Sequence, residues 1–368
     1  MSPKNKIALR RIFIFIVLWL ILGLTYIILE RGILGNTKIY PATGNPYDFR
    51  GALLSIFPGS MIMGGLFGSL EVFIINKLLS RKPFFVKLIL KGLIYLTILM
   101  LFLTIMTIFS NAYQLQLSVT DPIVIDKLKA FTSNTAFWSV IMYASIGTMA
   151  AVFISEVSNY LGPNVLENFI NGKYHKPREE SRIFMFLDMK SSTSIAEELG
   201  HVKYFNFLNQ YFADLTEPII DSEGEIYQYV GDEIVASWEM NEKDNRSKAI
   251  EAFFNAKELL KSKEEKYKNE FGIVLEFKAG IHGGRVSTGQ IGTIKKDIVF
   301  SGDVLNTAAR IQSLCNTYNS ELLVSQWIIE HSRLSDYLIV KEIGHLQLKG
   351  KTEEVKVYSI TNTENEIS

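Results

Sequence analysis

Two aspartates stand at positions where a carboxylate could do chemistry. Asp188 ends the apolar run from Phe184 to Leu187 and precedes a Ser/Thr-rich stretch, and Asp232 follows Gly231 between two short apolar runs. Taken singly, Asp188 suits a helix cap and Gly231-Asp232 suits a tight turn. Taken together, two carboxylates offer the oxygen ligands that Mg²⁺ prefers, and bound Mg²⁺ in turn attracts phosphate.

A second group of polar residues could act on the same substrate. The segment "SGDVLNTAARIQ" spaces Asn306 and Arg310 four apart, which puts both on one face of a helix. The alternative is a polar stripe on a surface helix whose Ala308 and Ala309 face inward. Near Asp188, the backbone N–H groups of residues 190–193 at a helix start could bind phosphate oxygens.

The elements that would position these residues follow from the apolar pattern. It predicts strands at 182–187, 225–230, 233–238 and 274–284, a helix at 191–221 with a break near Gly200, and a charged helix at about 244–270. This order predicts an α+β, ferredoxin-like (βαββαβ) fold with helices on one sheet face. The first strand then lies beside the hairpin, so Asp188 and Asp232 are expected to converge and hold two Mg²⁺ ions.

The N-terminal half has a different character. Its first eighteen-residue uncharged stretch, Ile12 to Leu29, has about the length that a helix needs to cross a bilayer. Three similar stretches follow at Gly51–Leu70, Gly92–Ser110 and Ala136–Ile154. Glu30 and Arg31 follow the first run, which favours an uncleaved anchor over a signal peptide. The pattern predicts a four-helix transmembrane bundle with both termini on one side.

The distribution of Lys and Arg predicts the orientation. Basic residues gather before the first span and between the second and third, at Lys4, Lys6, Arg10, Arg11, Lys77, Arg81, Lys82 and Lys87. Because basic loops stay on the cytoplasmic face, the N-terminus and the C-terminal domain are expected to be cytoplasmic in an integral membrane protein. Membrane lipid is therefore an expected partner.

Two features of the second span invite a functional interpretation. Gly64 and Gly68 form a GxxxG pair, for which packing inside one bundle is favoured over a dimer face. Glu71 lies near the end of this span, where it either reaches the interface or acts as an intramembrane functional group, for example in ligand sensing.

Composition bounds the remaining possibilities. The 368 residues carry no formal net charge, so no strongly basic balance points to nucleic acid, and the single cysteine, Cys315, excludes an intrachain disulfide framework. We expect a membrane domain at 1–159, a connector with a short helix at 160–180, a catalytic domain at 181–361 and a polar tail at 362–368.

Five segments carry a resemblance to the catalytic domain of class III nucleotide cyclases. They are "FMFLDMKSST", "YQYVGDEIVASW", "FKAGIHGGRV", "FSGDVLNTAARIQ" and "GHLQLKGKTEEVKVYSI", in family order and spacing over about Arg182 to Ile360. The resemblance implies that a ribose 3′-hydroxyl attacks the α-phosphate of a nucleoside triphosphate and pyrophosphate leaves. Two Mg²⁺ or Mn²⁺ ions per site would be held by Asp188, Asp232 and the backbone carbonyl of Met189.

The same resemblance implies roles for the other polar residues. Asn306 would orient the ribose and Arg310 would neutralise charge on the α-phosphate. Lys349, or Lys351 two residues later, would bind the triphosphate, together with the turn formed by Ser191, Ser192 and Thr193. Family sites form between two catalytic domains, and since this sequence has one, the resemblance implies a homodimer.

Base choice is the point where the sequence departs from the family. The two positions that usually read adenine hold Gln228, which can donate and accept hydrogen bonds, and Val299, which has no side-chain partner to offer. ATP is favoured, with GTP or a pyrimidine triphosphate as alternatives. Two other classes stay open: an inactive cyclase-like nucleotide-binding sensor, and a transport protein regulated by its soluble domain.

Overall fold

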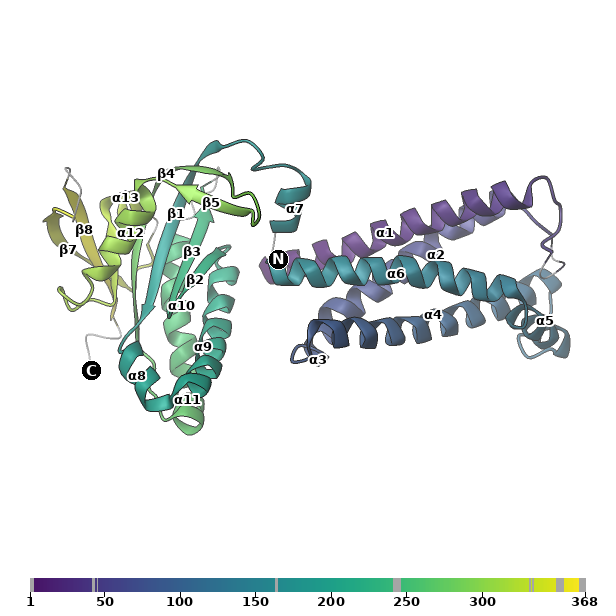
Figure 1. The fold of residues 1–368 in the computed structure, drawn as a ribbon, viewed down its shortest axis with the longest axis horizontal. Helices are drawn as coiled ribbons and strands as arrows, with labels where there is room; N and C mark the ends of the chain where they lie inside the picture. The colour runs from purple at the N-terminus through teal and green to yellow at the C-terminus, as the bar shows by residue number, and fades with distance from the viewer. Residues whose placement is uncertain are drawn as a thin grey trace. The chain divides into compact units, whose positions relative to one another are not determined.

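The computed structural model describes residues 3–41, 44, 46–162, 165–240, 246–330, 332, 334–348 and 354–363. It divides into a helical unit, Asn5–Leu166, and a mixed α/β unit, Glu167–Ser368 (Figure 1).

Long apolar helices make up the helical unit. Among the described residues, four helices are long and apolar enough to cross a membrane: α1 (Pro3–Leu34), α2 (Phe49–Leu70) with its continuation to Leu78, α4 (Phe84–Leu115) and α6 (Thr135–Leu161). They match the four predicted spans but extend beyond them, because the polar residues that flank each apolar run continue the helix. Asp48 and Asn134 cap α2 and α6 by accepting backbone N–H groups.

Two local features of this unit differ from expectation. The short helix α5 (Pro122–Thr132) lies between the third and fourth predicted spans, where no helix was predicted, and Asp121 caps it ahead of a proline at the first helical position. After α2 the chain forms a π-helical turn, Glu71–Ile75, before α3 (Asn76–Leu78). Such π-turns often accompany functional sites.

The GxxxG pair packs α2 against α1. A Cβ atom added at Gly64 would lie 2.5 Å from the Cα atom of Ile16, and one at Gly68 would lie 2.9 Å from the Cα atom of Ile12. Both glycines are therefore required for the close approach of these helices, which confirms the prediction of packing inside the bundle.

A charged cluster is buried inside the bundle. Lys91 of α4 is fully buried, and its Nζ atom lies 2.5 Å from Glu71 Oε1 and also contacts Glu156 of α6. It donates a further hydrogen bond of 2.6 Å to Asn76. Glu71 is therefore buried inside the helical unit and does not reach its surface. Its partners escaped prediction because Lys91 and Glu156 stand just outside the uncharged stretches that defined the spans.

The α/β unit contains the expected ferredoxin-like core. Its elements are β1 (Arg178–Met189), α8 (Ser192–Leu199), α9 (His201–Asp221), β2 (Glu225–Val230), β3 (Glu233–Glu239), α10 (Arg246–Ser262), α11 (Glu264–Phe271) and β4 (Phe277–Ile291). The strands are antiparallel in the order β2-β3-β1-β4. The first strand thus lies beside the β2–β3 hairpin, as predicted (Figure 1).

Further strands extend this core. Beyond β4 the described sheet continues through β6 (Leu322–Ser325), β8 (Val355–Asn362) and β7 (Leu338–Leu346), while β5 (Asp297–Ser301) pairs with the second half of β4. β4 reaches Ile291, beyond the predicted strand end, because pairing with β5 holds its second half. The helix break predicted near Gly200 is confirmed, and Gly200 has a φ of +70°.

β1 begins at Arg178, inside the segment 160–180 that was expected to be connector. Polar residues concealed this part of the strand, because Glu180 and Arg182 are charged and yet buried. Arg182 Nε donates to Glu180 Oε1 at 2.8 Å, and Thr288 of β4 donates to the same oxygen. Paired and hydrogen-bonded charges can lie inside a sheet.

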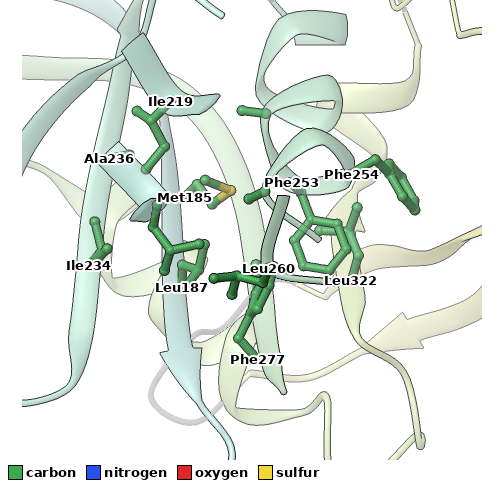
Figure 2. Close-up of a cluster of buried hydrophobic side chains, with 14 of the residues drawn as sticks. Met185, Leu187, Ile219, Ile234, Ala236, Phe253, Phe254, Leu260, Phe277 and Leu322 are labelled. Atoms are coloured by element: carbon green, nitrogen blue, oxygen red, sulfur yellow. The ribbon is translucent and has the colours of Figure 1, made fainter. Parts of the chain in front are cut away.

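Two layers of helices cover the two faces of the sheet. On one face, side chains of the strands pack with α9 and α10, and Figure 2 shows part of this cluster around Met185, Leu187, Ile234 and Phe253. On the other face, Phe184 and Val235 pack with Ala308 of α12 (Asp303–Ser313). Side chains alternate along β1 between these faces, so Asp188 lies on the same face as Phe184, the face that α12 covers.

Candidate active site

Asp188 stands at the end of β1, between two strands and one helix. In the sheet it is paired with Lys278 of β4, whose Nζ atom lies 3.2 Å from Asp188 Oδ2. Gln312 of α12 donates a hydrogen bond of 2.9 Å to the same oxygen. The carboxylate is half-buried and has positive and polar neighbours on the α12 side.

Asp232 reaches the same place from the β2–β3 turn. Gly231 has a φ of +64°, which glycine adopts without strain, and it allows the turn that carries Asp232 at the hairpin tip. Burial raises the pKa of Asp188, and the charge of Asp232 together with a hydrogen bond between the two groups raises it further. Lys278 acts in the opposite direction. The structure therefore brings the two aspartates together.

A third carboxylate, Glu233, was missed by sequence reasoning. The register pairs Leu187 with Ile234, so Glu233 is the next residue across from Asp188 on β3. Burial first, and then the charges of Asp188 and Asp232, raise the pKa of Glu233 to about 7. Its position after Asp232 in "VGDEIV" made it look like an ordinary strand residue.

The turn after β1 offers backbone donors on one side of Asp188. Ser191 has a left-handed φ of +59° and precedes α8, whose first turn contains Ser192 and Thr193. The first N–H groups of a helix have no partner within it and can bind an anion. The N–H of Lys190, which we expected to contribute, instead donates to Glu276 O at 2.9 Å. Met189 ends β1 with a buried side chain, next to Asp188 in the chain.

Asn306 and Arg310 lie on α12, away from the carboxylates of their own chain. Neither residue forms a hydrogen bond or ion pair with Asp188 or Asp232 in the described part of the chain. Gln312, which does contact Asp188, follows Arg310 by two residues and is therefore about 200° further around the helix. The Nη1 atom of Arg310 is buried without a hydrogen-bond partner among the described residues.

The expected base-reading and triphosphate residues are less closely tied to this site. Gln228 is exposed in β2 at a bulge that shifts the β2–β3 register. Val299 is half-buried in β5, opposite Gly289. Lys349 and Lys351 lie outside the described residues.

Lys278 and Gln312 are further site residues that were missed. Both contact Asp188, but each comes from a different part of the chain and neither stands in a recognisable motif. The strand alternation around Lys278 was a usable signal, because Phe277 and Ala279 are buried on the opposite face.

The carboxylate pair fits a divalent cation. Two neighbouring carboxylates repel one another, and a cation between them would relieve both the repulsion and the raised pKa of Asp188. In the described residues no group of three or more His, Cys, Asp or Glu side chains is placed to hold a metal, so backbone and substrate oxygens would complete the coordination. Fold and site together fit an α+β domain that binds a phosphorylated ligand through such cations.

Comparison with known families agrees with this class. Residues 174–362 match the family model described as the adenylate and guanylate cyclase catalytic domain. The match covers just over half of the chain and includes both aspartates, Asn306 and Arg310. The chain therefore belongs to the adenylate and guanylate cyclase family.

Individual relatives are similar over parts of their length. Adenylate cyclase 2 of Rhizobium meliloti (strain 1021) is 30% identical over 223 residues, which are 61% of this chain and 61% of the relative. Adenylate cyclase of Anabaena cylindrica is 26% identical over 203 residues, 54% of this chain and 40% of the relative. The chain thus spans less than two thirds of either relative.

A solved structure supports the fold. A bacterial light-regulated adenylyl cyclase superposes with a TM-score of 0.51 at 21% sequence identity, covering 60% of this chain and 65% of that one.

Proposed function

We propose that the protein is a membrane-bound nucleotide cyclase that converts a nucleoside triphosphate, ATP by preference, into the 3′,5′-cyclic nucleotide and pyrophosphate. The observation that supports this proposal most is that Asp188, at the end of β1, lies near Asp232, in the turn before β3. Membership of the cyclase family supports the reaction class. In the reaction, the ribose 3′-oxygen forms a bond to the α-phosphorus as the bond to the pyrophosphate oxygen breaks.

The two aspartates would hold Mg²⁺ or Mn²⁺, two ions per site, with the backbone carbonyl of Met189 as an additional ligand. Bound cations supply charge neutralisation and a lowered pKa of the attacking hydroxyl. Lys278 forms an ion pair with Asp188. If Asp188 bound a cation instead, the Nζ atom of Lys278 would be free to pair with a phosphate oxygen. The N–H groups at the start of α8, with Ser191, Ser192 and Thr193, would hold other phosphate oxygens.

Asn306 and Arg310 would act on the substrate of a second copy of the chain. They share one face of α12, and that face points away from the carboxylates of the same chain, as the position of Gln312 indicates. Two copies related by a twofold axis would complete two equivalent sites, with Asn306 orienting the ribose and Arg310 neutralising the α-phosphate. The Nη1 atom of Arg310 is buried and has no hydrogen-bond partner among the described residues, which supports such a role.

ATP is the favoured substrate because the similar proteins from Rhizobium meliloti and Anabaena cylindrica are named adenylate cyclases. Gln228 could read the base through its amide, whereas Val299 leaves only backbone groups nearby. GTP and pyrimidine triphosphates are the alternative substrates. Lys349 is proposed to bind the triphosphate, with Lys351 as the alternative.

The four long apolar helices support a location in the membrane with four spans. The basic residues before α1 and between α2 and α4 support a cytoplasmic N-terminus and catalytic domain. We divide the chain into a membrane domain to about residue 159, a connector, and a catalytic domain that ends near residue 361.

The test is to incubate the purified full-length protein with Mg²⁺ or Mn²⁺ and each of the four nucleoside triphosphates, and to identify products by mass spectrometry. A 3′,5′-cyclic nucleotide is expected, with ATP as the best substrate. Asp232→Asn should abolish turnover while the protein stays folded. Nucleotide binding without any cyclic product would show an inactive sensor and overturn the proposal.

A further inference from the structure

A cavity of about 300 Å³ lies between α4 and α6 in the helical unit. Among the residues that line it are Gly92, Tyr95 and Leu99 of α4, and Ser145, Met149 and Val152 of α6. It has the volume of a small ligand site, and ligand pockets commonly form between the helices of a bundle.

The wall of the cavity is almost wholly apolar and depends on a glycine. A Cβ atom added at Gly92 would collide with the terminal methyl group of Met149, so this glycine opens the space between the helices. Among the described residues, no charged side chain lines the cavity. The space opens at the surface of the helical unit, where Leu93 and Met149 are exposed, so apolar molecules can enter it.

Ser145 provides one unused polar group in this wall. Its Oγ atom is buried and has no hydrogen-bond partner in the described residues. Thr148, one turn away on the same helix, satisfies its hydroxyl on Ala144 O at 2.7 Å, which is the usual solution inside a helix. Because a buried, unpaired hydroxyl is unfavourable, Ser145 is prepared to bond with a molecule in the cavity.

The cavity is connected to the buried charged cluster. Tyr95 lines the cavity, and its hydroxyl donates to Glu71 Oε2 at 2.6 Å. Glu71 pairs with Lys91, which also pairs with Glu156 near the end of α6. Lys91 is saturated by Glu71, Asn76 and Glu156, so it is not available to a ligand.

We propose that this cavity binds a neutral molecule from the lipid phase that has a long apolar part and one hydroxyl or carbonyl group. The polar group would bond to Ser145 Oγ and the apolar part would fill the space beside Gly92. An ionised carboxylate is disfavoured, because no cationic side chain in the described part of the chain lines the cavity to pair with it.

The test uses the full-length protein in phosphatidylcholine nanodiscs and a long-chain alcohol that carries a photoreactive diazirine. After irradiation, labelled positions are mapped by mass spectrometry. Adducts are expected within residues 89–99 and 145–152, and unlabelled hexadecanol should compete for them more strongly than ionised hexadecanoic acid. The readout is labelling, so it is independent of cyclase activity and of the proposed reaction.

Two variants test the site itself. Ser145→Ala should weaken competition by hexadecanol about fivefold to tenfold, the loss of one hydrogen bond, and Gly92→Leu should abolish labelling by filling the cavity. Matched controls are Ser139→Ala, on the exposed face of α6, and Gly59→Leu, where an added Cβ meets no atom within 4 Å. Labelling spread evenly over lipid-facing residues, or unchanged in both cavity variants, would overturn the proposal.

Discussion

At the scale of single residues, Lys278 is the positive charge that lies beside the carboxylate pair. Asp188 and Asp232 repel one another, and Glu233 adds a third acidic group beside them. Lys278, 3.2 Å from Asp188, offsets part of this repulsion. The remaining negative charge would be stabilised by additional positive charge, which divalent cations would supply.

The pKa of Glu233 leads to a prediction of pH dependence. Its folded-state pKa is raised from 4.5 to about 7, so folding favours its protonated form. This contribution to stability is complete below about pH 4.5 and is lost as the pH rises through about 7. We expect the melting temperature of the metal-free protein to fall over this range.

Glu233→Gln should flatten that decline because Gln has no proton to lose, and saturating Mg²⁺ should also reduce it. Thermal unfolding of the detergent-purified protein across this pH range measures both effects. The same decline in wild type and Glu233→Gln would show that another group is responsible.

A second residue-scale prediction concerns Lys278. Lys278→Met removes the positive charge beside Asp188 and leaves both aspartates in place. Mg²⁺ should therefore still bind, while the KM for the triphosphate rises. We expect a loss of about tenfold or more in kcat/KM, typical of a charge-assisted phosphate contact. Steady-state kinetics measures it, and Lys278→Arg should restore most of the loss. Wild-type kinetics in Lys278→Met would exclude a phosphate-binding role.

At the scale of elements, the charged cluster links α2 with its continuation, α4 and α6 inside the helical unit. Glu71, Lys91 and Glu156 each come from a different helix, and all three are almost fully buried. The π-helical turn begins at Glu71 itself. The cluster is thus a specific link between helices that otherwise pack through apolar surfaces.

Removing one member of the cluster should destabilise the bundle. Lys91→Met removes the cation that contacts both buried carboxylates and leaves Glu156 only the longer contact of 3.9 Å to Lys87, so it should lower stability by about 3–5 kcal/mol. The triple variant Glu71→Gln, Lys91→Met and Glu156→Gln removes the charges together and should recover much of that loss. Unfolding in mixed micelles compares the two variants. Equal destabilisation by both would show that shape, and not charge pairing, matters here.

The connector carries a prediction of the same scale. α6 ends at Leu161, while Tyr174 is buried in the α/β unit and hydrogen-bonds to Gln290 through its backbone. Residues inserted directly after Gly162 should therefore alter cyclase activity and leave nucleotide binding unchanged. Calorimetry and turnover assays on an insertion series measure both quantities. Constant activity across the series would contradict a role of the connector in orienting two catalytic domains.

At the scale of the whole molecule, the proposed active site needs residues from two chains. The aspartates lie where β1 ends and β3 begins, and Asn306 and Arg310 face away from them on α12. In a twofold dimer, the two aspartates of one chain would face Asn306 and Arg310 of the other chain. Two equivalent sites would then form. Activity should then depend on protein concentration wherever dimers dissociate.

Mixing inactive chains tests this directly. Asp232→Asn and Arg310→Ala should each be inactive, but an equal mixture of both chains should recover about one quarter of wild-type activity. The reason is that about half of randomly formed dimers contain both variants, and each of these has one intact site. Co-expression followed by a turnover assay measures it. No recovery in a proven mixed dimer would place the site within one chain.

The sequence by itself determined the elements with strong periodic or compositional signals. The four apolar stretches are helices, and the strand order around Asp188 and Gly231-Asp232 is ferredoxin-like. Such signals are local, because bilayer length, strand alternation and turn residues act over a few neighbours in the chain. The convergence of the two aspartates followed from topology alone.

Only the tertiary structure decided which side chains meet across the chain. Lys278 and Gln312 reach Asp188 from another strand and a helix, and Lys91 joins two glutamates from other helices. The structure also shows that β1 begins at Arg178, because Glu180 and Arg182 are buried in the strand as a hydrogen-bonded pair. A charged side chain looks solvent-exposed in a sequence until its partner is in place, because burial becomes favourable only when the opposite charge or a hydrogen bond is already there.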